Sequence, residues 1–310
     1  MRSMAINLYN IKKWYKMLIG KSVSHVKQDV GRFYKKDYVA GYYNDMTEKV
    51  IKQPGLLISS DVPHIISEKG EDIIFPVAVF QYGLGAYDLW IEKKEPIYLE
   101  KFRQCVAWSI DNQQQNGAWN NFFFYYPDHP YGAMAQGEGA SLLIRAYIEF
   151  NDNKYLEAAR NAIDFMLLPI EAGGTTDYKN NDLVMLEYTH RECVLNGWVF
   201  SLFGLYDYAI ASDDERYREV WEKATHSLEK RLPDFYGKYW SMYDLAGRIS
   251  SPFYHHLHIA QMKAMYDLTG YKLFKDTSDR WEKYDRNKLF KALAFIKKMT
   301  QKLFEKESAK

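Results

Sequence analysis

The chain has 310 residues, a formal net charge of +1 and 47% hydrophobic residues. A chain of this length can bury one large core or two smaller ones, and its near-neutral net charge does not identify a class of partner. No apolar run reaches the roughly 18 residues of a membrane-spanning helix, which argues against an integral membrane protein. Cys105 and Cys193 fall in predicted helices, so we expect free thiols and a cytoplasmic location.

Residues 1–65 are predicted to form an N-terminal unit, a basic amphipathic helix followed by an arm. In this helix the apolar residues Ile11 and Trp14 alternate with Lys12 and Lys16. We expect the apolar stripe to pack on the rest of the protein. Peripheral contact with an anionic membrane surface is the alternative.

Residues 66–310 are predicted to form one larger domain, because an apolar stretch that ends in tyrosine recurs about every 60 residues. Each stretch is followed by a short polar turn and a charged, striped segment, so the repeated unit is a helical hairpin. The tyrosines are Tyr87, Tyr147, Tyr206 and Tyr266, and the expected hairpins pair residues 75–91 with 96–114, 137–151 with 153–169, 192–211 with 213–232 and 255–269 with 271–284.

Helix start and stop signals support these boundaries. Pro96 suits the first turn of a helix, and Gly270 suits the position just after the end of one. The run Ser212-Asp-Asp-Glu215 has the form of a capping box, so we expect Ser212 to cap the helix that follows it.

The first helix of each hairpin is apolar nearly all round, whereas the second has one polar face. An inner ring of helices wrapped by an outer ring satisfies both patterns. We therefore predict an all-α fold, an α/α-toroid or incomplete α/α barrel of about four hairpins, with short β or irregular segments in the long loops. A solenoid is the alternative. The last helix, residues 286–306, is basic, and we expect its apolar stripe (Leu289, Leu293 and Ile296 among others) to pack on the toroid. Contact with an anionic membrane surface is the alternative for this helix as well.

The connections between hairpins are long, whereas the turns within hairpins are short. Residues 115–136, 170–191 and 233–254 form the long loops. In a toroid all loops of one kind emerge at one end, and loops of this length in compact domains are usually functional. We therefore expect the active face at the N-terminal ends of the inner helices.

Short motifs around these loops follow one another as Met134-Ala-Gln-Gly, Glu187-Tyr188, Val194-Leu-Asn-Gly, Leu205-Tyr-Asp, Tyr243-Asp-Leu and Tyr254-His. Together they resemble the C-terminal domain of D-glucuronyl C5-epimerases, which invert C5 of glucuronic acid in heparosan-type chains to give iduronic acid. The resemblance spans about residues 70–282 and implies an α/α-barrel catalytic domain. One departure is that Ala246 follows Tyr243-Asp-Leu where the family has an arginine, and Arg248 comes two places later.

The resemblance implies that Glu187, Tyr188, Tyr243 and Tyr254 are the catalytic residues. Removing the C5 proton of a uronate builds negative charge beside a carboxylate, so the reaction needs a charge-neutralising group and an acid and a base on opposite ring faces. Glu187 would be the base and Tyr254 the proton donor. Residues expected to bind substrate, several of them candidates to hold its carboxylate, are Tyr82, Gln136, His190, Arg191, Asn196, Arg248 and His255.

The expected partner is a uronate-containing polysaccharide. We expect no cofactor, no metal ion and no nucleic-acid partner. Either a monomer or a homodimer is compatible with the sequence. His255-His-x-His258 lacks the matching carboxylates of a metal site. Three alternatives stay open. They are a uronate polysaccharide lyase, an inverting glycoside hydrolase that pairs Glu187 with Glu138 or Asp244, and a non-catalytic glycan-binding protein.

Overall fold

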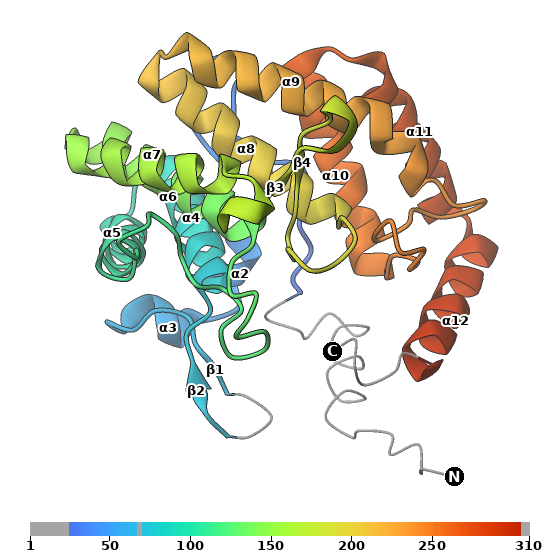
Figure 1. Cartoon of the computed structure of the whole chain (residues 1–310). Helices are drawn as coiled ribbons and strands as arrows, with labels where there is room; N and C mark the ends of the chain where they lie inside the picture. The colour runs from blue at the N-terminus through green and yellow to red at the C-terminus, as the bar shows by residue number, and fades with distance from the viewer. Residues whose placement is uncertain (1–24, 67–69, 305–310) are drawn as a thin grey trace.

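The computed structural model describes residues 25–66 and 70–304, so the predicted N-terminal helix lies outside the described residues. Four helical hairpins form the body of the molecule, as the tyrosine period predicts (Figure 1). The inner helices, each of 18 residues, are α4 (Pro76–Lys93), α6 (Ala133–Phe150), α8 (Leu195–Ser212) and α10 (Pro252–Thr269). The outer helices are α5 (Pro96–Asp111), α7 (Asn153–Leu167), α9 (Glu215–Arg231) and α11 (Lys272–Arg286).

The inner and outer helices differ in burial as their sequences predict. In α8, 15 of 18 residues are buried, whereas in α9 only 5 of 17 are. The inner helices contact one another in the order α4, α6, α8, α10, and each outer helix packs on the inner helix of its own hairpin. The arrangement is therefore an α/α-toroid.

Each inner helix ends in the same way, with one residue in the left-handed conformation that turns the chain into the outer helix. These residues are Lys94, Asn151, Asp213 and Gly270, with φ values of 56°, 51°, 52° and 75°. The expected Ser212 cap is wrong by two positions. Helix α8 continues through Ser212, and the side chain of Asp214 caps α9 by accepting a hydrogen bond from the Arg216 N–H at 3.0 Å.

The short elements lie between and beside the hairpins. The elements are α2 (Thr47–Ile51), α3 (Pro54–Ile58), β1 (Ile65–Ile66), β2 (Asp72–Ile73), β3 (Thr176–Asp177), β4 (Val184–Met185), the 3-10 turns Ile170–Ala172, Lys179–Asn181 and Leu232–Phe235, and the C-terminal helix α12 (Lys288–Phe304). The antiparallel pair of β3 and β4 lies in the second long loop, where short β segments are expected, and the pair of β1 and β2 precedes the first inner helix.

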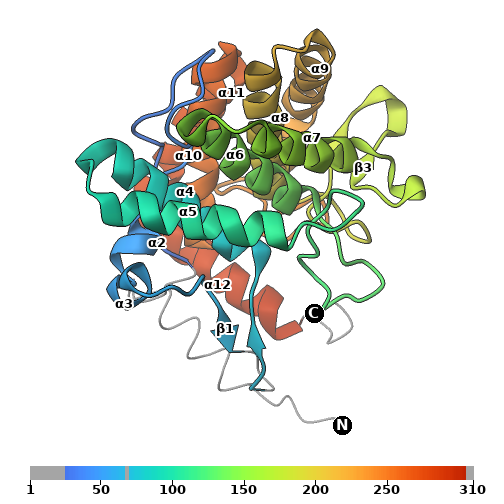
Figure 2. The same cartoon turned by 90° about the vertical axis from the view of Figure 1, so that its left-hand side faces the viewer.

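The N-terminal segment from residue 25 to α2 shares the hydrophobic core of the toroid, although the sequence places it in a separate unit. Tyr42, Tyr43 and Met46 are almost fully buried in that core. The segment lies beside α4 and α10, the first and last inner helices (Figure 2). Arg32 pairs with Glu92 of α4, and the Tyr34 hydroxyl donates to Asp267 of α10. The segment therefore bridges the ends of the incomplete ring.

Helix α12 packs on the toroid through a different face from the one expected. Ala294 is fully buried beside Trp240, whereas Leu289, Leu293 and Ile296 are 65%, 40% and 58% exposed. The predicted packing of these three side chains is therefore wrong. Among residues 25–66 and 70–304, no helix combines the length and apolar character needed to cross a bilayer.

Candidate active site

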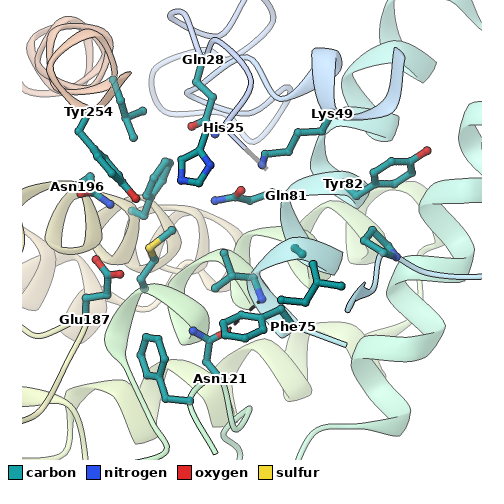
Figure 3. Close-up of a pocket in the computed structure, with 18 of the residues that line it drawn as sticks. His25, Gln28, Lys49, Phe75, Gln81, Tyr82, Asn121, Glu187, Asn196 and Tyr254 are labelled. Atoms are coloured by element: carbon teal, nitrogen blue, oxygen red, sulfur yellow. Dashed lines mark hydrogen bonds between the residues drawn. The ribbon is translucent and has the colours of Figure 1, made fainter. Parts of the chain in front are cut away.

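A cavity of about 590 Å³ opens at the N-terminal ends of the inner helices, the face predicted from the loop lengths. This volume lies within the range of roughly 300–1,000 Å³ typical of ligand sites. Every inner helix contributes its first turns, as in Tyr82 of α4, Met134 of α6, Asn196 of α8 and Tyr254 of α10. In Figure 3, Glu187, Asn196 and Tyr254 lie on one side, Lys49 and Tyr82 lie on the other, and Gln81 lies between them.

The three long loops are joined to one another beside this cavity. The Ala133 N–H at the end of the first loop donates to the Leu186 carbonyl of the second at 2.8 Å. After the second loop, the Leu195 N–H donates to the Tyr243 carbonyl of the third at 3.1 Å. Backbone hydrogen bonds thus bring together residues that are far apart in the sequence.

Two glycines allow Glu187 to lie against the first turns of α6 and α8. A Cβ on Gly197 would lie 2.6 Å from Glu187 Oε2, and a Cβ on Gly132 would lie 2.1 Å from the Glu187 carbonyl oxygen. Both distances are far shorter than a van der Waals contact. The glycines therefore permit Glu187 to occupy a position where it is 8% exposed and lines the cavity.

The surroundings of Glu187 favour its protonated form. Burial raises its pKa to about 7 and Asp244 adds to the rise, whereas the Tyr188 hydroxyl and Arg248 oppose it. Glu187 Oε2 is buried and has no hydrogen-bond partner among the described residues. A carboxylate with a pKa near neutral and an unused oxygen at a cavity wall is suited to act as a general base.

The three predicted catalytic tyrosines surround Glu187. Tyr188 and Tyr254 line the cavity, and Tyr243 lies behind Tyr254 with a ring-centroid separation of 4.8 Å. Burial raises the pKa of all three hydroxyls, and the negative charge of Glu187 raises each further. The hydroxyls therefore stay protonated at neutral pH and can donate. The structure brings the four predicted catalytic residues into one cluster.

The predicted binding residues are more dispersed. Tyr82 and Asn196 line the cavity. Gln136 is fully buried away from it, where its amide accepts from the Trp119 N–H at 2.9 Å. His190 and Arg191 lie on the outer side of Tyr126, whose hydroxyl accepts from Arg191 at 2.8 Å.

Two further candidates for carboxylate binding, Arg248 and His255, do not line the cavity. Arg248 pairs with the buried Asp244. His255 is fully buried and donates through Nε2 to the Trp281 carbonyl at 3.1 Å while its Nδ1 faces Ser241 Oγ at 2.8 Å. Burial lowers the pKa of His255 to about 4, so the ring is neutral and cannot supply positive charge.

One further residue at the cavity, which no motif in the sequence indicates, is Lys49 of α2, and it is only 6% exposed. Gln81 also lines the cavity, and its Nε2 donates to Glu138 Oε1 behind it at 2.8 Å. Burial lowers the pKa of Lys49 to about 8 and raises that of Glu138 to about 8. The sequence offers one indication of a buried Lys49, which is its place between the apolar residues Met46 and Val50. In the structure it lies on the buried side of the short helix α2.

Metal-binding clusters and disulfides are absent from the part of the chain that the structure describes. No three His, Cys, Asp or Glu side chains within residues 25–66 and 70–304 are grouped so that they could hold a metal ion. Cys105 and Cys193 are free and buried, which confirms the expected thiols. The polar groups that line the cavity are carboxyl, hydroxyl, amide and ammonium groups and the imidazoles of His25 and His64.

Comparison with known proteins connects this chain to one family. The profile described as D-glucuronyl C5-epimerase C-terminus matches residues 105–283, more than half of the chain. The D-glucuronyl C5-epimerase of Caenorhabditis elegans is 28% identical over 223 residues, which are 63% of this chain and 36% of that protein. An uncharacterized protein of Methanocaldococcus jannaschii is 28% identical over 156 residues, 48% of this chain and 51% of that protein. The chain therefore spans between a third and about half of the length of these relatives.

A solved structure shares the fold. The unsaturated glucuronyl hydrolase of Bacillus sp. GL1, described as responsible for the degradation of glycosaminoglycan, aligns with a TM-score of 0.50 at 10% identity. The alignment covers 77% of this chain and 66% of that one. At this level of identity the likeness concerns the α/α-toroid alone.

Proposed function

This chain belongs to the family of the D-glucuronyl C5-epimerase C-terminus, and on that premise we propose that it inverts C5 of D-glucuronate residues to L-iduronate in a heparosan-like or surface polysaccharide. The main support is Glu187, a buried carboxylate with a pKa of about 7 at the wall of a cavity that Tyr188 and Tyr254 also line. These groups can remove and return a proton without a cofactor.

The proposed reaction has two proton transfers. Glu187 accepts the C5 proton, and the electrons of the C5–H bond move into the adjacent carboxylate to give an enolate. The Tyr254 hydroxyl then donates a proton to the opposite face of C5, so that the configuration is inverted. Solvent afterwards returns a proton to Tyr254 and removes one from Glu187. Tyr188 and Tyr243 donate hydrogen bonds within the cluster and support the charge that develops.

The carboxylate positions favour this chemistry over glycoside hydrolysis. A hydrolase needs a second acid that faces the same sugar as Glu187. Asp244 is held by Arg248, and Glu138 is fully buried behind Gln81, so neither lines the cavity. A lyase would use the same base but would expel the C4 substituent, and product analysis distinguishes it.

Aromatic side chains beside the cavity favour a polymer over a free monosaccharide. Phe123, Phe124 and Tyr125 are 55%, 55% and 49% exposed on the first long loop, and Tyr125 also lines the cavity. Flat apolar faces of this kind can pack on sugar rings that flank the reacting residue.

Incubation of the full chain with heparosan and other glucuronate polymers in heavy water tests the proposal. We expect NMR to show deuterium at C5 and new iduronate signals, with no ultraviolet absorbance from a C4–C5 double bond. Unsaturation would make the protein a lyase. An unchanged polymer across the whole panel would contradict catalysis on these substrates.

The role of Tyr254 has its own test. Tyr254→Phe removes only the hydroxyl, so we expect C5 inversion to fall by about 10²–10⁴-fold while substrate binding persists. Tyr271→Phe, which removes an exposed hydroxyl hydrogen-bonded to His226 outside the cavity, is the matched control. Full activity in Tyr254→Phe would remove this residue from the reaction.

A further inference from the structure

The C-terminal helix α12 carries an apolar stripe on its outer side. Leu289, Leu293 and Ile296 are 65%, 40% and 58% exposed. Residues spaced three and four positions apart lie on one face of a helix, so the three side chains form one continuous stripe. Each of the other helices within residues 25–66 and 70–304 exposes at most one large apolar side chain. The stripe is therefore a distinct feature of α12 and not part of a general trend.

The opposite side of α12 is fixed to the third long loop. Ala294 is fully buried beside Trp240 of that loop. Gln301 Nε2 donates to the Gly247 carbonyl at 3.0 Å, and Gln301 Oε1 accepts from the Ile249 N–H at 2.9 Å. Because these contacts already hold the helix by its inner side, the toroid to which α12 is attached does not cover the stripe.

All charged residues of α12 are positive. The helix contains no aspartate or glutamate, and its lysines are Lys288, Lys291, Lys297, Lys298 and Lys302. At about 3.6 residues per turn, Lys288 and Lys297 fall on the two borders of the stripe, where both are exposed. An apolar stripe bordered by lysines is typical of helices that lie in the interface of an anionic bilayer, with the ammonium groups at the level of the headgroups.

Other occupants of this face match only part of its chemistry. An acidic polysaccharide supplies negative charge but no apolar layer for the stripe. A second copy of α12 would meet the first with like charge, and so would residues 1–24, which contain five basic residues and no acidic ones (Arg2, Lys12, Lys13, Lys16 and Lys21). Like charges repel, so both arrangements are disfavoured. A bilayer with anionic headgroups supplies the apolar layer and the opposite charge together.

We propose that α12 docks the protein on the surface of an anionic phospholipid bilayer, with its apolar stripe among the acyl chains and its bordering lysines at the phosphate groups. The helix lies beside the candidate active site, since the Lys298 ammonium is 5.2 Å from the ring centroid of Tyr243. In Figure 1, α12 and the β1–β2 pair both reach the lower side of the molecule, and Ile65 of β1 lines the cavity. A docked protein therefore keeps its cavity close to the bilayer. Docking of this kind is independent of the reaction in the cavity.

Co-sedimentation of the full chain with lipid vesicles tests docking. Vesicles of equal parts phosphatidylglycerol and phosphatidylcholine are compared with vesicles of phosphatidylcholine alone. We expect at least about 10-fold tighter binding to the anionic vesicles, because each lysine near a negative surface strengthens binding about fivefold. Added salt should weaken this binding. Equal affinity for the two compositions, or no binding to either, would overturn the proposal.

The double variant Leu289→Gln/Ile296→Gln removes most of the stripe and keeps every lysine. Glutamine is a good helix former, so α12 should persist, which circular dichroism checks. We expect affinity for the anionic vesicles to fall by about 10- to 100-fold, because each aliphatic side chain that is largely buried contributes about 10-fold. Ile148→Gln, at a residue of α6 that is 44% exposed, is the matched control and should bind like the wild type. Leu293→Gln serves as a milder variant if the double variant does not fold.

The double variant Lys288→Gln/Lys297→Gln separates charge from apolar contact. It should lose about 10- to 30-fold in affinity for the anionic vesicles, whereas Lys223→Gln on the exposed side of α9 should lose little. If only the lysine variant loses binding, charge alone holds the protein, as it would on an acidic polymer, and insertion of the stripe is refuted. If the wild-type protein forms dimers without lipid and Leu289→Gln/Ile296→Gln is monomeric, the stripe is an interface between copies and the membrane proposal fails.

Discussion

The two ends of the inner helices use buried charge differently. At the C-terminal end, Arg145 of α6 donates to Asp207 of α8 at 2.7 Å, and the Tyr43 hydroxyl donates to the other Asp207 oxygen at 2.7 Å. At the N-terminal end, Glu138 and Glu187 each keep one buried oxygen without a partner among the described residues. At the first end opposite charges pair across the ring, although Arg145 Nε lacks a hydrogen-bond partner among the described residues. At the second end two carboxyl oxygens remain that a ligand can engage.

Glu187→Gln should have the largest effect on activity. The substitution removes the proposed base with little change of shape, so we expect C5 exchange to fall by about 10²–10⁴-fold. Stability should not fall, because a buried carboxyl with an unpartnered oxygen becomes a neutral amide. Exchange rates and thermal unfolding would be compared with those of Glu192→Gln, which changes an exposed glutamate five residues further along the chain. Comparable activity in the two variants would contradict the base assignment.

Arg145→Met should break the opposite end of the molecule. It leaves Asp207 buried without its main partner, which costs about 3–5 kcal/mol in the free energy of unfolding. Arg216→Met, which removes an arginine whose side chain is 79% exposed beside Asp214, should leave stability nearly unchanged. Urea denaturation measures both variants, and an equal shift in the two midpoints would show that the buried pair has no special role.

Gly197→Ala should disturb the catalytic end alone. The new methyl group would lie 2.6 Å from Glu187 Oε2 and must displace that side chain. Since small displacements of a catalytic group cost about 10²-fold, we expect kcat to fall by that amount. Gly55→Ala is the control, because no atom lies within 4 Å of its added Cβ. Wild-type turnover in Gly197→Ala would mean that the position of Glu187 is not critical.

The pH dependence of the reaction should show a smaller, graded effect. A base acts only when ionised, so kcat/KM should rise about tenfold per pH unit below the Glu187 pKa of about 7 and then level off. Asp244, Tyr188 and Arg248 set this pKa together with burial. Rates measured from pH 5 to 9 test it. A midpoint close to the ordinary glutamate value of 4.5 would indicate a base exposed to water.

Much of the fold could be predicted because hydrophobic periodicity is a local property. The tyrosine period located the four hairpins, and the contrast between Val194–Ile210 and the striped segment after it distinguished inner from outer helices. The loop lengths indicated the end of the ring where the cavity lies. The motifs likewise led to Glu187 and the three tyrosines that surround it.

The role of each ionisable group was decided only by tertiary structure. Lys49 stands in a segment with no repeat or motif, and its position at the cavity depends on how α2 meets α4. Arg248 is a plausible carboxylate ligand by its place in the sequence, but in the structure it pairs with Asp244. A pKa and a free hydrogen-bonding group depend on desolvation by atoms from several distant segments, whereas a helix depends mainly on its own residues.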